Sequence, residues 1–228
     1  MKNPLLLLLL IFLISSCSKN EKISSEDEIV IDYFKDIALG FEFGNSSNIT
    51  RKWVTEIKVF IGGKSSPELL TEFEKIRTDI NKLATDGFSV KVVNDSLQSN
   101  YYIFFGTGAK YANIFPYESD LVVSNWGLFH VFWNSQNQFY KGHMYVDIIR
   151  ANAIEQKHLL REEFTQSLGL AKDSPLYMES IFQSKWTTTT EYAKIDKELI
   201  RLLYHPKMSI GLNETEVDKV LRNILING

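Results

Sequence analysis

The chain has 228 residues, of which 44% are hydrophobic and 23% are charged, a balance typical of one globular domain with a sizeable core. Its formal net charge of −3 argues against the basic proteins that bind nucleic acid through the phosphate backbone. Cys17 is the single cysteine, so the chain has no paired-cysteine metal site and no internal disulfide.

The first sixteen residues have the pattern of a secretion signal. Lys2 gives a basic start, and Leu5 to Ile14 is an unbroken apolar run of ten residues, too short to span a membrane as a helix. The run ends in Ile14-Ser15-Ser16-Cys17, which resembles the lipobox of bacterial lipoproteins. This resemblance implies cleavage after residue 16 and fatty acylation of Cys17, with several acyl chains for stable anchoring. A plain signal peptide with a chance cysteine is the alternative.

Two further expectations follow from the leader. Ser18, in place of an aspartate after the cysteine, implies sorting to the outer membrane in families with this pattern. Loss of Lys2 with the leader changes the formal charge from −3 to −4. We therefore expect a lipid-anchored protein of the bacterial cell envelope, with no nucleic-acid partner.

The mature chain divides into a tether and one domain. Residues 17–28 are polar and charged after the cysteine, which predicts a flexible tether. Large apolar residues begin at Ile29, so we place the domain at residues 29–228 and expect it to open with a short packed helix.

The first half of the domain predicts an α/β arrangement. Alternation from Trp53 to Gly63 indicates a strand. Ser66 and Pro67 then begin a long helix whose apolar residues recur at three and four positions as far as Leu83. Two strands follow, in "FSVKVV" and "YYIFFG". We expect this helix to pack on a small mixed sheet.

The second half predicts a hairpin and then helices. The apolar runs "LFHVFW" and "HMYVDII" form a hairpin, or an edge strand and its neighbour. Helices are expected over residues 155–170 and within "EYAKIDKELIRLLY", and the last helix opens at Asn213 with Glu216 as its capping-box partner. One domain accounts for the whole pattern.

The helix over residues 155–170 carries the candidate site. At about 100° per residue, Leu160, Phe164 and Leu168 share the core face. His158, Glu162 and Gln166 form a second column with Glu163 beside them, either lining a cleft or facing solvent.

This stretch fits the frame of the zincin peptidases, in which His-Glu-x-x-His on a helix binds zinc and the glutamate activates water. Glu163 takes the place of the general base, Gly169 that of the chain-turning glycine, and Glu162 and Gln166 those of the two histidines. Lys172 falls at the third ligand's place with Asp173 beside it. "MESIF" (residues 178–182) resembles the methionine-bearing turn that usually reads Ser-Ile-Met.

A more specific resemblance covers roughly Ile29 to the C-terminus. "YFKDIALGFEFG", "REEFTQSLGLAKDS", "YMESIF" and "IDKELIRLLYHPKMSIGL" together resemble the bacterial family called domain of unknown function 2927. The resemblance implies a zincin-like architecture, in which the family itself lacks the two histidines, and it implies no particular reaction.

The residues in this frame are poor zinc ligands. Gln166 offers a neutral amide oxygen and a charged Lys172 cannot ligate, so no metal or other cofactor is expected at the standard position. One alternative is a displaced zinc site of His158, Glu162 and Asp173. The other places the Lys172 ammonium where the ion would lie, paired with Glu162 and hydrogen-bonded to Gln166.

The remaining histidines and aromatics are interpreted as structural. His130 is predicted to be a packed or edge-strand histidine rather than a ligand. His143 is predicted to be a surface histidine at the start of an edge strand, with the alternative that it borders the cleft as that strand does in zincins, and His205 is predicted to end a helix. Aromatic residues in residues 126–140 are expected mostly in the core, with some lining a peptide groove: Trp126, Phe129, Phe132, Trp133 and Tyr140.

Three functions remain open at this point. The favoured one is a lipid-anchored, non-catalytic zincin-like domain that binds a peptide, an envelope polymer or a protein partner. The second is an atypical metal-dependent peptidase or hydrolase with Glu163 as general base. The third is a purely structural envelope lipoprotein.

Overall fold

A computed structural model describes residues 23–44 and 46–227, so the predicted leader and residues 17–22 of the predicted tether, Cys17 among them, lie outside the described residues. The helices of the described part are α1 (Ser25–Ala38), α2 (Pro67–Leu83), α3 (Gly108–Ile114), α4 (Leu121–Ser124), α5 (Ala153–Gln166), α6 (Lys194–Leu203) and α7 (Glu214–Asn227). Within this part of the chain, no helix combines the length and apolar character needed to cross a bilayer.

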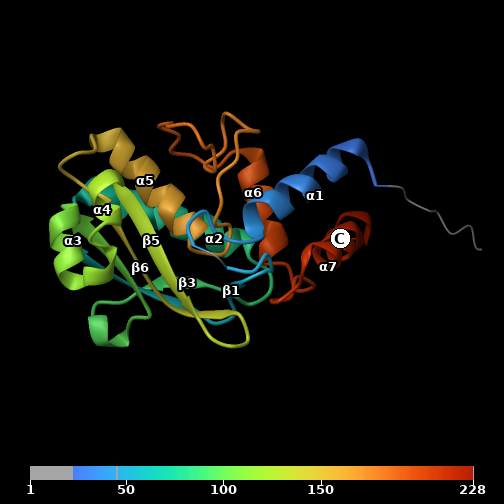
Figure 1. The fold of residues 1–228 in the computed structure, drawn as a ribbon, viewed down its shortest axis with the longest axis horizontal. Helices are drawn as coiled ribbons and strands as arrows, with labels where there is room; N and C mark the ends of the chain where they lie inside the picture. The colour runs from blue at the N-terminus through green and yellow to red at the C-terminus, as the bar shows by residue number, and fades with distance from the viewer. Residues whose placement is uncertain (1–22, 45, 228) are drawn as a thin grey trace, which may run out of the picture.

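The strands form one mixed sheet. They are β1 (Lys52–Trp53), β2 (Ile57–Gly63), β3 (Val90–Val92), β4 (Tyr101–Gly106), β5 (Gly127–Trp133) and β6 (Gln138–Asp147). Strands β3, β2, β4 and β6 lie side by side in that order and run parallel, and β5 pairs antiparallel with β6. The short β1 pairs with the first residues of β6, before β6 reaches β4. The sheet therefore ends on the antiparallel strand β5, which lies in front in Figure 1 with α5 above it.

Alternating strand residues contribute to two separate cores, one on each face of the sheet. On one face, Ile103 and Phe105 of β4 join the main core together with residues of α2 and α5. On the other face, Phe104 of β4 and Tyr145 of β6 pack with Tyr111 of α3. Figure 1 shows α3 and α4 at one end of the molecule and α1, α6 and α7 at the other.

Local capping and one buried ion pair fix α2 and α5. The Ser66 hydroxyl accepts the Leu69 N–H and caps α2, while Asn152 and Glu155 form a capping box at the start of α5. Where the two helices meet, the guanidinium of Arg161 lies 2.5 Å from the Glu72 carboxylate, and Arg161 is fully buried. This pair holds the site helix against the helix that covers the sheet.

Residues 25–28 belong to helix α1, and their prediction as part of the tether is wrong. Ser24 and Asp27 form a capping box, and the Glu28 carboxylate lies 2.5 Å from the guanidinium of Arg222 in α7. The segment is polar because its side chains cap a helix and bind a distant one. Polarity alone does not reveal either role.

Most other elements agree with the predictions. The mixed α/β fold is confirmed, with its long packing helix, its site helix and its helical C-terminal part. The predicted strand over residues 53–63 is interrupted at residues 54–56, and the short helices α3 and α4 were not predicted. The expectation that His143 starts an edge strand is wrong, because β6 lies between β4 and β5 and the edge belongs to β5.

Candidate functional site

A cleft of about 1020 Å³ runs between helix α5 and the edge strand β5. Residues 41–44 and Ser46 border it on one side and residues 183–186 on another, and it continues around β5 to Glu118. Six carboxylic acids line it, against one lysine: Glu42, Glu118, Glu155, Glu162, Glu163, Asp173 and Lys185. The site-bearing face of α5 therefore lines a cleft, and the alternative of a solvent-facing column is wrong.

The column of α5 points into this cleft as the helical spacing predicts. His158, Glu162, Glu163 and Gln166 all line it, while Phe164 on the opposite face is fully buried in the core. The Glu162 carboxylate lies 3.3 Å from His158 Nε2, and His158 Nδ1 lies 2.7 Å from the Thr189 carbonyl oxygen. Burial lowers the pKa of His158, but its contacts with Glu162 and the Thr189 carbonyl, together with the charge of Asp173, outweigh burial and the net shift is upward.

Glu163 is wedged against the edge strand. A Cβ added at Gly127 of β5 would lie 2.7 Å from Glu163 Oε1, so the glycine makes room for the carboxyl group. Burial, followed by repulsion from Glu162, Asp173 and Glu42, holds the pKa of Glu163 well above its usual range. A carboxyl group in this state keeps its proton to higher pH than an ordinary glutamate does.

Two further carboxyl groups reach the same place from loops. The Glu42 N–H donates to the Ala171 carbonyl at 3.1 Å, which ties the segment after α1 to the segment after α5. Asp173 accepts a hydrogen bond of 2.6 Å from the Gln166 amide. Burial and then the charges of Glu162 and Glu42 raise the pKa of Asp173 to about 7, and burial with Glu162 raises the pKa of Glu42.

Gly169 performs the turn that the sequence predicts for it. Its φ is +119°, and an added Cβ would lie 2.1 Å from the Arg51 carbonyl oxygen. A side chain at this position is therefore excluded both by the backbone conformation and by the space available. The turn directs residues 170–173 back along α5 and delivers Asp173 to Gln166.

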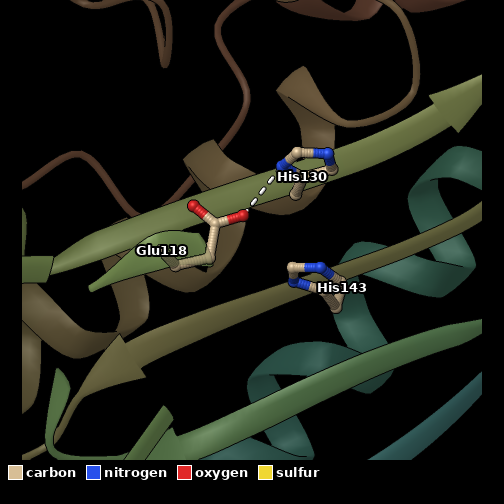
Figure 2. A group of neighbouring side chains, drawn as sticks. All are labelled: Glu118, His130 and His143. Atoms are coloured by element: carbon tan, nitrogen blue, oxygen red, sulfur yellow. Dashed lines mark ion pairs between the residues drawn. The ribbon is translucent and has the colours of Figure 1, made fainter. Parts of the chain in front are cut away.

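A second group of ligating side chains lies on the opposite face of the sheet from α5. Glu118 comes from a 3-10 turn (Pro116–Glu118), while His130 of β5 and His143 of β6 are paired directly across the strands. One ligand atom from each of the three lies within 4.8 Å of the others. Figure 2 shows both imidazoles and the carboxylate gathered beside the two strands. The sequence interpretation of His143 as a surface residue is wrong, since only 1% of it is exposed.

The model of the family described as "Protein of unknown function (DUF2927)" matches residues 27–223. The chain belongs to this family. Its resemblance to the family, predicted from the motifs that span α1, α5 and α6, is thereby confirmed.

Solved structures add only a distant likeness. The structure titled "Structure of Myroilysin" is 11% identical, covering 68% of this chain and 82% of that chain, with a TM-score of 0.41. The one titled "Crystal structure of myroilysin" is 12% identical, covering 75% and 95%, with the same TM-score. No curated protein matches the chain in sequence. These values are too low to assign an activity to the family member described here.

The expected pairing of Lys172 is not found in this member of the family. Lys172 lies outside the cleft lining, and among the described residues Glu162 is paired with His158 and Gln166 donates to Asp173. Asp173, one position later, takes the inward place. The side chains of successive residues after a tight turn diverge. The spacing of the zincin motif therefore could not show whether Lys172 or Asp173 would point into the cleft.

The residues at the zincin zinc position do not fit a catalytic zinc ion. The Gln166 amide is hydrogen-bonded to Asp173, and Lys172 does not line the cleft. Of the three positions that bind zinc in zincins, only the one held by Glu162 therefore offers a zinc ligand. In the described part of the chain, the displaced set of His158, Glu162 and Asp173 does not bring its ligand atoms within 4.8 Å of one another. Phe182 takes the place of the turn's methionine, fully buried, while Met178 is exposed.

Two contributors to the cleft were missed by sequence reasoning. Glu42 lies within one of the family motifs, and the only sequence signal for its role was its position between Phe41 and Phe43 in a stretch bounded by glycines. Trp186 lies in a loop without any pattern, 5.5 Å from Trp126 between ring centroids. The aromatic residues of 126–140 were expected mostly in the core, but Trp126, Phe129 and Trp133 line the cleft and none of the five is fully buried.

Proposed function

We propose that this chain is a lipid-anchored envelope protein whose zincin-like domain binds an extended peptide carrying a basic side chain, without cleaving it. The observation that carries the proposal is the charge of the cleft. Four of its carboxyl groups, from Glu42, Glu162, Glu163 and Asp173, form no ion pair with a lysine or arginine in the part of the chain that is described. A cationic group is the chemical partner that such a cleft lacks.

The energetic argument rests on mutual repulsion. Glu162 and Glu42 both raise the pKa of Asp173, and the same two groups together with Asp173 raise that of Glu163. Removing carboxylates from water without a counter-charge costs several kcal/mol. A lysine or arginine side chain in the cleft offsets part of this cost, so ligand binding and ionisation of the carboxyl groups are linked.

The walls of the cleft suit an extended chain. Among the described strands β5 pairs only with β6, so its other edge faces the cleft and can accept a peptide as an added strand. Phe41 stacks on Trp133 at 5.3 Å between ring centroids, and Trp126 meets Trp186 farther along the cleft. Aromatic surfaces of this kind bind the apolar side chains that alternate with the basic one.

The absence of cleavage is proposed from the donor set. Glu162 and Gln166 occupy the positions of the two zincin histidines, and Lys172 occupies the position of the third ligand. These three residues do not make a three-ligand zinc site. Hydrolysis with Glu163 as general base is the second candidate. Its buried carboxyl group with a raised pKa favours that alternative, because such a group suits proton transfer.

The test measures the binding of two fluorescein-labelled decapeptides of alternating valine and threonine. One carries a central lysine, and the other carries norleucine at the same position. Fluorescence polarisation at pH 8 should give about tenfold or greater preference for lysine, since one well-formed charge contact contributes about 1.4 kcal/mol or more. Glu162→Gln should abolish the preference. Glu191→Gln, which removes the same charge from an exposed position outside the cleft, is the matched control.

Three outcomes decide between the candidates. Equal binding of the lysine and norleucine peptides, or a preference that survives Glu162→Gln, contradicts the proposal. Cleavage of the peptide seen by mass spectrometry, lost in Glu163→Gln with the fold intact, assigns the hydrolase instead. If no peptide is recovered from a random library of extended sequences, the third candidate, a structural envelope protein, is favoured.

Anchoring is tested separately through Cys17, which lies outside the described residues. Bacteria expressing the chain are grown with an alkyne analogue of palmitate, and the label is expected on the wild type and not on Cys17→Ser. Fractionation should place the labelled protein in the outer membrane, as Ser18 implies. Label that persists on Cys17→Ser contradicts the lipoprotein assignment.

A further inference from the structure

The second cluster, Glu118 with His130 and His143, is independent of the acidic residues on α5. Cross-strand pairing places the two histidines directly opposite one another on the face of the sheet that α3 covers. Their rings stack at 5.3 Å between centroids with 15° between the planes. Glu118 then approaches them from a different element, so three parts of the chain converge on one point (Figure 2).

Glu118 has a buried carboxylate oxygen that lies against His130. The residue is 1% exposed, and its Oε1 lies 2.7 Å from His130 Nδ1. This contact is an ion pair when the imidazole is protonated (Figure 2), and Oε1 has no other hydrogen-bond partner in the described structure. A buried carboxylate oxygen in this state is destabilising unless another ligand or ion completes it.

His143 is oriented by two tyrosines. Its Nδ1 lies 2.5 Å from the hydroxyl of Tyr111, which is fully buried, and its Nε2 lies 2.7 Å from the hydroxyl of Tyr117, which is exposed. A neutral imidazole has one N–H and one lone pair, so one hydroxyl accepts and the other donates. The buried Tyr111 is the fixed partner of Nδ1, and the exposed Tyr117 can turn away from Nε2.

We propose that Glu118, His130 and His143 form a binding site for a divalent transition-metal ion, with zinc as the expected occupant. Two imidazoles and a carboxylate are a favourable zinc set, with the fourth position left to water or a ligand. Ligand atoms around a tetrahedral zinc ion lie about 3–3.5 Å apart, so only small side-chain movements separate the described geometry from a bound one. The Tyr111 contact keeps the His143 ring in place, as hydrogen bonds from neighbouring groups do for other metal-binding histidines.

The site opens toward the cleft, because Glu118 and His130 belong to its lining while His143 lies behind them. An ion held there faces the same groove as the acidic residues of α5, but from the other side of β5. The proposal does not depend on peptide binding, and it uses none of the residues at the zincin zinc position.

Zinc titration of the full-length chain in detergent micelles tests the site. Protein stripped with a chelator and dialysed is titrated with Zn²⁺ against a chromophoric competitor, and one ion per chain is expected. His130→Ala and Glu118→Gln should each weaken binding by about tenfold or more. Replacement of zinc by cobalt supplies a second measurement, because a cobalt ion in a tetrahedral site gives visible absorption bands. His130→Ala should remove these bands.

Matched controls separate this site from the rest of the molecule. His205→Ala removes a histidine from another part of the chain, and Glu162→Gln removes a carboxylate from α5; both should bind zinc as the wild type does. Circular dichroism of each variant verifies the fold. Binding that survives His130→Ala and Glu118→Gln, binding that is lost in Glu162→Gln, or no stoichiometric binding at all overturns the proposal.

Discussion

Replacement of Asp173 by asparagine should stabilise the protein at pH 8 and do so much less at pH 5. The amide keeps the size of the carboxyl group, and its oxygen can still accept the hydrogen bond from Gln166. It removes one negative charge from the group formed with Glu42, Glu162 and Glu163. The substitution thus isolates the electrostatic cost of the cleft from its packing.

The magnitude follows from the pKa of Asp173, which is about 7 in the folded protein against an ordinary 3.8. Each pKa unit corresponds to about 1.4 kcal/mol, so full ionisation costs the folded state about 4 kcal/mol. Because the folded pKa is raised, the folded state retains its proton longer than the unfolded chain. Stability is therefore unaffected by this group below about pH 4 and declines as the pH rises to about 7.

At pH 5 the penalty has reached about a third of its full size, and at pH 8 it is complete. We expect Asp173→Asn to gain about 2–4 kcal/mol at pH 8, which corresponds to a rise in melting temperature of about 4–10 °C for a domain of this length. Scanning calorimetry at the two pH values measures the difference. Asp120→Asn, an exposed aspartate without an ion pair in the described structure, should shift the melting temperature by less than about 2 °C at either pH.

A gain of the same size at pH 5 and pH 8 would refute the electrostatic reasoning, and so would a loss at pH 8. The first result would mean that Asp173 destabilises the fold through its shape. The second would mean that its charge is already neutralised by a partner. Either result would also weaken the case for a cationic ligand in the cleft.

Three further substitutions test the framework around the site. Gly169→Ala should cost about 2–4 kcal/mol in denaturant unfolding, because φ is +119° and the new Cβ meets the Arg51 carbonyl; an equally stable variant would contradict the turn. Arg161→Met should cost about 3 kcal/mol or more, because it leaves the Glu72 carboxylate buried without its close partner, and adding Glu72→Gln should recover part of the loss. Asp196→Ala should cost about 2 kcal/mol or more by leaving the Ser180 hydroxyl and the Ile181 and Ala193 N–H groups without their acceptor, and no change in thermal melting would refute it.

The secondary structure near the site was largely predictable, because it follows from short-range patterns. Ser66 and Pro67 begin α2 where expected, and the Asn213–Glu216 box opens α7. The core face of α5 was also predictable from spacing, with Leu160 and Phe164 fully buried. Two element ends were predicted wrongly: the site helix ends at Gln166 and not at residue 170, and residues 25–28 are helical where a charged segment is held by Arg222 of α7, far along the chain.

The site itself was predicted only in part. Spacing on one helix correctly placed His158, Glu162, Glu163 and Gln166 together, because a helix repeats in a fixed way. Helical spacing could not show which of Lys172 and Asp173 lines the cleft, because their directions depend on the turn at Gly169. It also could not predict that Glu42, from another loop, lies in the same cleft. The pairing of His130 with His143 needed the register of β5 on β6, which neither strand specifies alone.

The sequence by itself determined the periodicity, the caps, the turn at Gly169, the family and the expectation of a lipid anchor, since each depends on residues close together in the chain. The tertiary structure decided which charges meet. Four carboxyl groups from a helix and two loops share one cleft, and a carboxylate and two imidazoles from three elements share another site. Electrostatic interactions depend on distance in space, and only the folded chain sets that distance.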